Sequence, residues 1–140
     1  MDNQLLQFAQ ANLLYVTLAV TSGAMLLWNL SGAGAAKGLS PLAATLLMNR
    51  EDAIVVDVRE AAEWAAGHIA NARHIPLGQL DKRLSELEKF KGRDVIVVCQ
   101  SGNRSAGACR RLGKSGFEKV HNLAGGIAAW TDAGLPVTSK

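Results

Sequence analysis

The sequence predicts an α/β fold, namely an open parallel sheet with helices on both faces, preceded by one transmembrane α-helix. Two short runs rich in Val and Ile, at residues 54–58 and 95–99, have the length and composition of buried parallel strands. Segments with helical spacing of apolar residues alternate with such runs, and alternating strands and helices form parallel sheets. A long apolar stretch near the N-terminus predicts the membrane helix.

The N-terminal segment, residues 1–30, differs from the rest of the chain because no charged residue occurs from position 3 to position 36. Its apolar stretch at about 11–30 reaches the roughly 20 residues that cross a bilayer core. Tyr15 and Trp28 stand toward the two ends of this stretch, where aromatic side chains favour the membrane interfaces. We therefore expect a single-pass helix that contacts membrane lipid.

Two alternatives to a membrane anchor stay open. A cleaved signal peptide would end at the small residues 33–35 (AGA), although no basic residue precedes the apolar stretch. A buried core helix is the other alternative, for which a small domain has little room. For an anchor, the first basic residue, Lys37, follows the helix, so the positive-inside rule places the following domain on the cytoplasmic side of the inner or plasma membrane.

Ala19 and Gly23 form a small-xxx-small pair, which would allow two such helices to self-associate. Residues 31–38 are rich in Gly and Ala and predict a short linker to a domain at 39–140. Ser40 and Pro41 predict a helix start, because Ser caps helices and Pro fits the first helical position. We expect, in order, a helix to about 48, strand 54–58, helix 60–65, strand 72–75, helix 79–90, strand 95–99, helix 104–114, strand 119–122 and helix 126–133.

The charge distribution excludes some functions. The chain of 140 residues carries 15 Lys and Arg against 12 Asp and Glu, without the clustered basic and aromatic residues of nucleic-acid-binding proteins, so no nucleic-acid partner is expected. The three histidines lack metal-ligand spacing, so no metal or other cofactor is expected. The two cysteines do not indicate a disulfide framework.

Cys99 ends the second Val/Ile run, and a polar turn connects it to the next helix. Gly102 gives this turn backbone freedom, so successive N–H groups can form a cup for an anion, to which the helix dipole adds. Such a cup stabilises a thiolate and lowers the pKa of the thiol. Cys99 is therefore predicted to be a nucleophile, the alternative being a buried structural cysteine. Cys109 lies on the apolar stripe of its helix and is expected in the core, the alternative being a resolving thiol.

The turn also supplies the predicted substrate-binding residues. Arg104 is expected to pair with the anionic group of a substrate, because a cation in the first helical turn is otherwise mildly unfavourable. The alternative is an exposed surface charge. The candidate loop consists of Gln100, Ser101, Gly102, Asn103, Arg104 and Ser105.

Four motifs resemble those of the rhodanese family of sulfurtransferases. Residues 54–60 (IVVDVRE) are similar to its strand with Asp-x-Arg, and residues 63–64 and 67–76 (EW and GHIANARHIP) to its second motif. The loop 99–105 (CQSGNRS) and residues 122–130 (NLAGGIAAW) resemble the remaining two. The motifs occur in the family's order over about 39–137.

The resemblance implies a rhodanese-like fold and sulfurtransferase chemistry. The Cys99 thiolate would attack the sulfane sulfur of a donor such as thiosulfate and hold it as a persulfide, which a thiol or cyanide acceptor would then remove. The resemblance also implies that Asp57 and Arg59 shape the floor of the site, the alternative being a structural ion pair. A membrane protein that supplies or accepts sulfur is the expected partner of a tethered domain.

Two other functions stay open. A Cys-dependent phosphatase uses a similar strand, cysteine, loop and arginine, but with a longer loop than the four residues between Cys99 and Arg104. The other is a membrane-tethered rhodanese-like binding or regulatory module. The presence of Cys99 argues against it.

Overall fold

The structure is a computed structural model that describes residues 2–30, 38–50 and 52–140. The chain divides into two compact units, Met1–Ala36 and Lys37–Lys140. The predicted linker at 31–38, except Gly38, and the small residues at 33–35 lie outside the described residues, as does Lys37. Each unit is described by itself.

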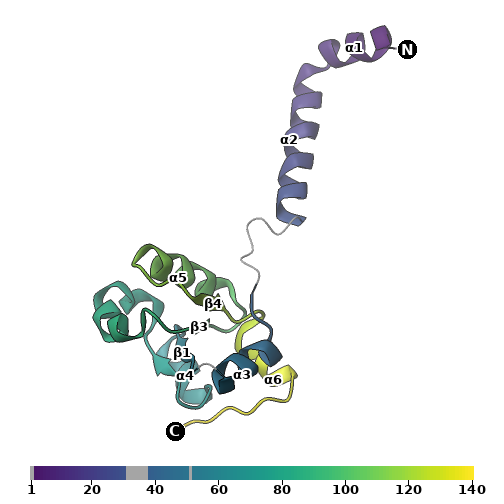
Figure 1. Ribbon diagram of the computed structural model, residues 1–140. Helices are drawn as coiled ribbons and strands as arrows, with labels where there is room; N and C mark the ends of the chain where they lie inside the picture. Colours follow the sequence, from purple (N-terminus) through teal and green to yellow (C-terminus); the bar gives the residue numbers. More distant parts are fainter. Residues whose placement is uncertain (1, 31–37, 51) are drawn as a thin grey trace. The chain divides into compact units, whose positions relative to one another are not determined.

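The first unit consists of two helices, α1 (Asp2–Ala11) and α2 (Leu13–Leu30) (Figure 1). The axes of Asn3–Ala11 and Leu13–Leu27 differ by 94°. Asn12 stands at the break, and its side-chain amide donates to the carbonyl of Phe8 at 3.0 Å. The backbone N–H of Asn12 donates to the same carbonyl, also at 3.0 Å.

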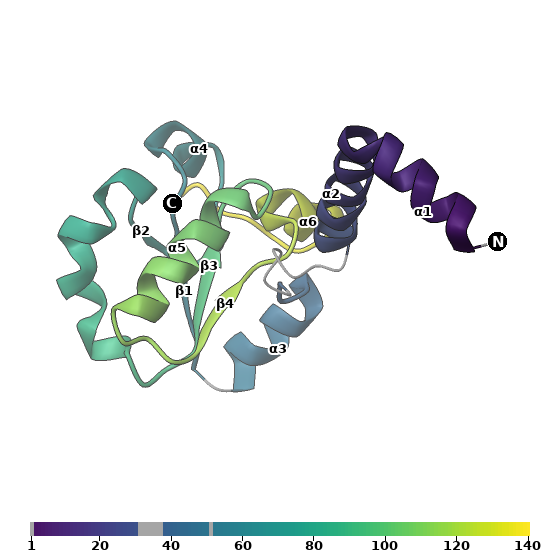
Figure 2. The same ribbon diagram turned by 90° about the horizontal axis from the view of Figure 1, so that it is seen from above.

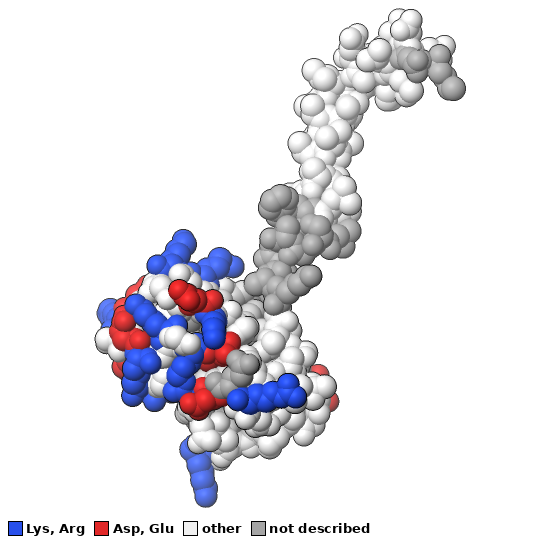
Figure 3. All heavy atoms as spheres, in the orientation of Figure 1, with Lys and Arg blue, Asp and Glu red and all other residues white. Residues whose placement is uncertain are grey.

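The predicted single transmembrane helix at about 11–30 is not shown by this arrangement. Among the described residues, neither helix is by itself long and apolar enough to cross a bilayer, whereas the bent pair meets the same length and composition criteria when taken together. On the face drawn in Figure 3, the residues of this unit that are not grey include no Lys, Arg, Asp or Glu. Its exposed large apolar side chains are Leu5, Leu6, Phe8, Leu13, Leu14, Tyr15, Leu18, Val20, Met25, Leu26 and Leu27.

The second unit contains the predicted parallel sheet. Its strands are β1 (Ile54–Asp57), β2 (Arg73–His74), β3 (Val95–Val98) and β4 (Val120–Asn122), in the order β2-β1-β3-β4. All neighbouring strands pair in parallel, with Asp57 beside both His74 and Val98. The α/β fold class predicted from the sequence is confirmed.

Helices cover both faces of this sheet (Figure 2). The α-helices of the unit are α3 (Pro41–Arg50), α4 (Ala61–Ala66), α5 (Asn103–Lys114) and α6 (Gly126–Asp132). One apolar cluster joins the sheet to α5 and includes Ala108 and Leu112, while a second joins the opposite face to α3 and α6 and includes Ala44 and Trp130. These elements begin and end within two residues of their predicted positions.

The segment predicted as a helix at 79–90 differs in type. It forms two 3₁₀ helices, Leu77–Gln79 and Asp81–Phe90. Its buried apolar residues Leu87 and Phe90 follow Leu84 at intervals of three, and Leu84 packs against the same cluster. With three residues per turn, a 3₁₀ helix keeps such a row on one side.

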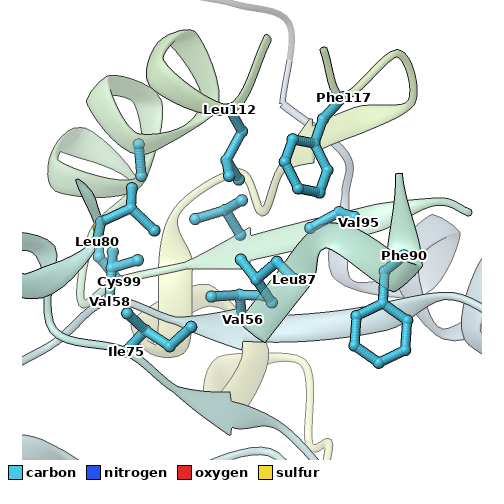
Figure 4. Packing of buried hydrophobic residues seen from close by; sticks show 12 residues of the cluster. Val56, Val58, Ile75, Leu80, Leu87, Phe90, Val95, Cys99, Leu112 and Phe117 are labelled. Atoms are coloured by element: carbon cyan, nitrogen blue, oxygen red, sulfur yellow. The ribbon is translucent and has the colours of Figure 1, made fainter. Parts of the chain in front are cut away.

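The alternation of β3 determines the direction of Cys99. Successive side chains of a strand point to opposite faces. Val95, Val97 and Cys99 accordingly belong to the cluster beneath α5, whereas Ile96 and Val98 belong to the opposite cluster. Figure 4 shows Cys99 at the end of the first cluster that also holds Val58 and Leu80.

Candidate active site

Cys99 directly follows β3 at the carboxyl end of the sheet. In the order β2-β1-β3-β4, the connection that follows β1 leads to one side of the sheet and the connection that follows β3 leads to the other side, so the strand order reverses between β1 and β3. Open α/β sheets bind their ligands at the carboxyl ends of the strands beside such a reversal. Cys99 is therefore at the position expected for an active site.

Two donors point at the sulfur of Cys99. The Gly102 N–H donates to Sγ at 3.0 Å, and the Ser105 hydroxyl oxygen lies 3.2 Å from Sγ. Gly102 caps the N-terminus of α5 with φ of 100°, a left-handed conformation that favours glycine. The predicted cup is thus formed at the junction of β3 and α5.

The pKa of Cys99 reflects two opposing effects. Burial raises the pKa of the thiol, since Cys99 is only 1% exposed. Hydrogen bonds from the Ser105 hydroxyl and from the N–H groups of Ser105, Ser101 and Gly102 outweigh burial and hold the pKa below its usual value. A thiolate, which is the reactive form of cysteine, is therefore favoured at this position.

Cys109 has the opposite character. It lies in α5, partly buried against the first apolar cluster, and burial raises the pKa of its thiol to about 12. It contributes packing, as the helical pattern predicts.

Helix α6 donates hydrogen bonds to the backbone at the start of the loop that forms the cup. The Ile127 N–H donates to the Cys99 carbonyl at 2.9 Å, and the Ala128 N–H donates to the Gln100 carbonyl at 3.2 Å. A Cβ on Gly126 would lie 2.6 Å from the carbonyl carbon of Gln100, so only glycine permits this approach. The glycine pair of the fourth motif therefore has a packing role that the sequence analysis did not assign.

Asn122, at the end of β4, is a further residue of the site that the sequence analysis missed. Its Nδ2 donates to the Gly102 carbonyl at 3.0 Å, and its Oδ1 accepts a hydrogen bond from the Ser105 hydroxyl. Asn122 thus contacts both residues that donate to Sγ. Its place within the fourth motif was a signal, but the contact with Ser105 depends on the pairing of β3 with β4.

Arg104 is paired with Glu63 of α4. Its two Nη atoms lie 2.7 and 2.8 Å from the two carboxylate oxygens. The hydrogen bond with Arg104 is the chief cause that lowers the pKa of Glu63 to about 2, and the same contact raises the pKa of Arg104. The Arg104 guanidinium, which was predicted to bind an anionic substrate, is therefore paired with a carboxylate in this structure. After Asn122, Glu63 is the second residue of the site that the sequence did not predict.

Asp57 and Arg59 form a buried ion pair at the carboxyl end of β1. The Arg59 Nη2 lies 2.9 Å from Asp57 Oδ2 and donates to the Gly67 carbonyl at 2.7 Å. Both side chains are nearly inaccessible. This geometry is that of a structural pair that joins β1 to the end of α4.

The rim of the cup carries neutral polar side chains. Gln100, Ser101 and Asn103 are exposed around the buried Gly102 and Ser105. Among the described residues, no group of three or more His, Cys, Asp or Glu side chains is arranged to hold a metal ion. The arrangement as a whole can stabilise a thiolate, or a sulfur anion attached to it, by directed N–H and O–H groups.

Comparisons with known proteins agree with this geometry. The profile of the family described as "Rhodanese-like domain" matches residues 40–133. A "Sulfurtransferase" from Allochromatium vinosum is 43% identical over 93 residues, which cover 66% of this chain and 85% of that protein. The "Thiosulfate sulfurtransferase GlpE" from Coxiella burnetii is 33% identical over 94 residues, covering 67% of this chain and 86% of that protein.

Among solved structures, a rhodanese-related protein from Thermoplasma volcanium is similar with a TM-score of 0.68 and 30% sequence identity. The alignment covers 75% of this chain and all of that protein.

Proposed function

We propose that this chain, which belongs to the rhodanese-like domain family, moves a sulfane sulfur from a donor such as thiosulfate to a thiol or cyanide acceptor through a persulfide on Cys99. The observation that carries this proposal is the pair of donors, the Gly102 N–H and the Ser105 hydroxyl, aimed at Cys99 Sγ. The names of the sulfurtransferase relatives support the reaction class.

In the first step, the Cys99 thiolate attacks the outer sulfur of thiosulfate. A bond forms between Sγ and that sulfur, the sulfur–sulfur bond of thiosulfate breaks, and its electron pair leaves with sulfite. Because Cys99 is almost fully buried, a terminal sulfur atom is the part of a donor best suited to reach it.

In the second step, an acceptor thiolate or cyanide attacks the outer sulfur of the persulfide. The bond between the two sulfurs breaks, and its electron pair returns to Sγ as thiolate, so neither an oxidant nor a reductant is consumed. The N–H groups of the loop stabilise negative charge on the sulfur before and after transfer.

The other predicted site residues lie around Cys99. Gln100, Ser101 and Asn103 provide exposed polar groups for the remainder of the donor. Arg104 keeps a positive charge beside the cup, although an anionic donor must compete for it with Glu63.

We further propose that the N-terminal unit attaches the protein to the inner or plasma membrane, with the rhodanese-like domain on the cytoplasmic side. The lack of charged residues from position 3 to position 36 and the exposed apolar side chains support contact with lipid. Gly23, with open space around it, together with Ala19 supports helix-mediated self-association, and a membrane protein that exchanges sulfur remains the proposed partner.

Carbonate washing of membranes from cells that produce the full chain tests this attachment. The protein should stay with the membranes, whereas a variant carrying Leu18→Lys and Met25→Lys should be released, because both positions are exposed apolar sites of α2. Release of the unaltered chain would contradict the proposal.

Intact-mass measurement after incubation with thiosulfate tests the reaction. The full chain, purified in detergent, should gain one sulfur atom that cyanide removes, and the Cys99→Ser variant should gain none. If the protein gains no sulfur while Cys99 still reacts with an alkylating agent, thiosulfate is not a donor. Protein persulfides would then be tested next, and failure with these as well would favour a binding module.

A further inference from the structure

We propose that Asn122 is a positioning residue that sets the reactivity of Cys99 by competing with the thiolate for the single hydroxyl hydrogen of Ser105. This inference rests on the proposed role of Cys99 as a nucleophile. It gives a function to a residue outside the loop that carries the cysteine.

The competition follows from counting hydrogens at Ser105. Its side chain is fully buried, and its Oγ lies within hydrogen-bond distance of both Cys99 Sγ and Asn122 Oδ1. A serine hydroxyl has one hydrogen and two lone pairs. Ser105 can therefore donate to only one of these two neighbours at a time.

The amide of Asn122 is held in one orientation. Its Nδ2 donates to the Gly102 carbonyl at 3.0 Å, which leaves Oδ1 facing Ser105. A flipped amide would place its oxygen against the carbonyl oxygen of Gly102 and lose this bond. Asn122 consequently acts toward Ser105 as an acceptor.

The hydrogen-bond chain has a different direction in each protonation state of Cys99. In the thiol state, the S–H donates to Ser105 Oγ, and the Ser105 hydrogen goes to Asn122. When the thiol releases its proton to the solvent, Sγ becomes an acceptor only, and the Ser105 hydrogen turns to it. Asn122 then loses its hydrogen bond from Ser105. Asn122 therefore stabilises the thiol relative to the thiolate, whereas the donors of the loop stabilise the thiolate.

Charged groups near Cys99 occur mainly in pairs. Arg104 of α5 pairs with Glu63 of α4, and Asp57 and Arg59 pair at the end of β1. His121 of β4 lies 2.8 Å from Asp94, which precedes β3 at the end of that strand opposite to Cys99. Cys109 of α5 is the second thiol, and its raised pKa keeps it neutral near pH 7. Because these groups are paired or neutral, the direction of the Ser105 hydrogen is a sensitive control on the thiolate.

The test is the pH dependence of the alkylation rate of Cys99 by iodoacetamide, measured in a Cys109→Ala background. Asn122→Ala should move the midpoint of this pH dependence, at which the rate is half of its plateau value, to lower pH by about half to one unit. The reason is that Ser105 is then free to donate to the thiolate. Ser105→Ala should move it to higher pH. When both substitutions are combined, the midpoint should equal that of Ser105→Ala alone.

Asn122→Asp is a second variant of nearly the same shape. Its carboxylate is a stronger acceptor than the amide, but it cannot donate to the Gly102 carbonyl. The pH midpoint of alkylation should rise, and the part of the rise that disappears when Ser105 is replaced by Ala measures the effect on the Ser105 hydrogen. Asn49→Ala, at an exposed position of α3, is the matched control and should leave the midpoint unchanged.

The proposal would be overturned if Asn122→Ala shifted the pH midpoint of alkylation equally in the presence of Ser105 and in the Ser105→Ala variant. Asn122 would then act only through the Gly102 carbonyl. A lack of any shift in a folded variant would overturn it as well. Alkylation does not require sulfur transfer, so these outcomes are independent of whether thiosulfate loads Cys99.

Discussion

The Arg104 guanidinium and the Glu63 carboxylate form a bidentate ion pair beside the nucleophile, with N–O distances of 2.7 and 2.8 Å. The two residues come from α5 and α4, and the side chains are 37% and 30% exposed. Glu63 cancels the positive charge that Arg104 would offer to an anionic donor. Thiosulfate, a dianion, therefore meets a rim whose side chains are close to neutral.

Replacing Glu63 by Gln should improve the use of thiosulfate. Gln keeps an oxygen that can accept from the Glu60 N–H, as Glu63 does at 3.2 Å, but it releases the Arg104 charge. We expect KM for thiosulfate to fall about 2- to 10-fold, the modest range reflecting the solvent exposure of the pair.

The matched control is Glu86→Gln, which removes a similar ion pair with Arg83 in the 3₁₀ helix Asp81–Phe90. It should leave KM unchanged. An unchanged or higher KM in Glu63→Gln would show that Glu63 does not limit the access of the donor to Arg104.

Cys99 should react faster than Cys109 with iodoacetamide at pH 7. The pKa of Cys99 lies below the ordinary 9.0, whereas that of Cys109 is raised to about 12. The alkylation rate should rise with pH and level off above the pKa, so the plateau for Cys99 begins at a lower pH than for an ordinary thiol. Peptide mapping after brief labelling measures both sites, and equal labelling would contradict the lowered pKa.

Gly126→Ala should destabilise the domain and reduce persulfide formation. Gly126 has φ of 62°, and its new Cβ would collide with the backbone of Cys99 and Gln100. The strained conformation and the collision together should cost about 2–4 kcal/mol. Urea unfolding measures this loss.

Gly113→Ala in α5 is the control for that substitution, since nothing lies within 4 Å of its added Cβ. In a helix interior it should be neutral or stabilise by up to about 1 kcal/mol. If both variants unfolded at the same urea concentration, the close approach of α6 to the loop would not matter for stability.

Asp57→Asn should lower the free energy of unfolding by about 3–5 kcal/mol, because it leaves the buried Arg59 charge without its carboxylate. Urea unfolding of the variant measures the loss. If the variant kept its stability but lost thiosulfate turnover, Asp57 would be a substrate contact rather than a structural partner.

Local sequence patterns predicted most of the fold. The Val/Ile runs identified β1 and β3 because buried parallel strands need apolar side chains on both faces, and the polar turn after Cys99 identified the cup. The 3₁₀ geometry at 81–90 was missed because Leu80 and Leu84 fit the spacing of an α-helix as well. The break at Asn12 was missed because the apolar stretch carries no local signal for a bend.

The sequence by itself determined the α/β class, the family resemblance and the position of Cys99, because these depend on residues close together in the chain. Only the tertiary structure decided which groups surround the sulfur. Glu63 and Arg104 are 41 positions apart, and Ser105 and Asn122 are 17 apart. Such partners meet because parallel strands bring the loops at their carboxyl ends together, and local spacing does not specify which side chains then pair.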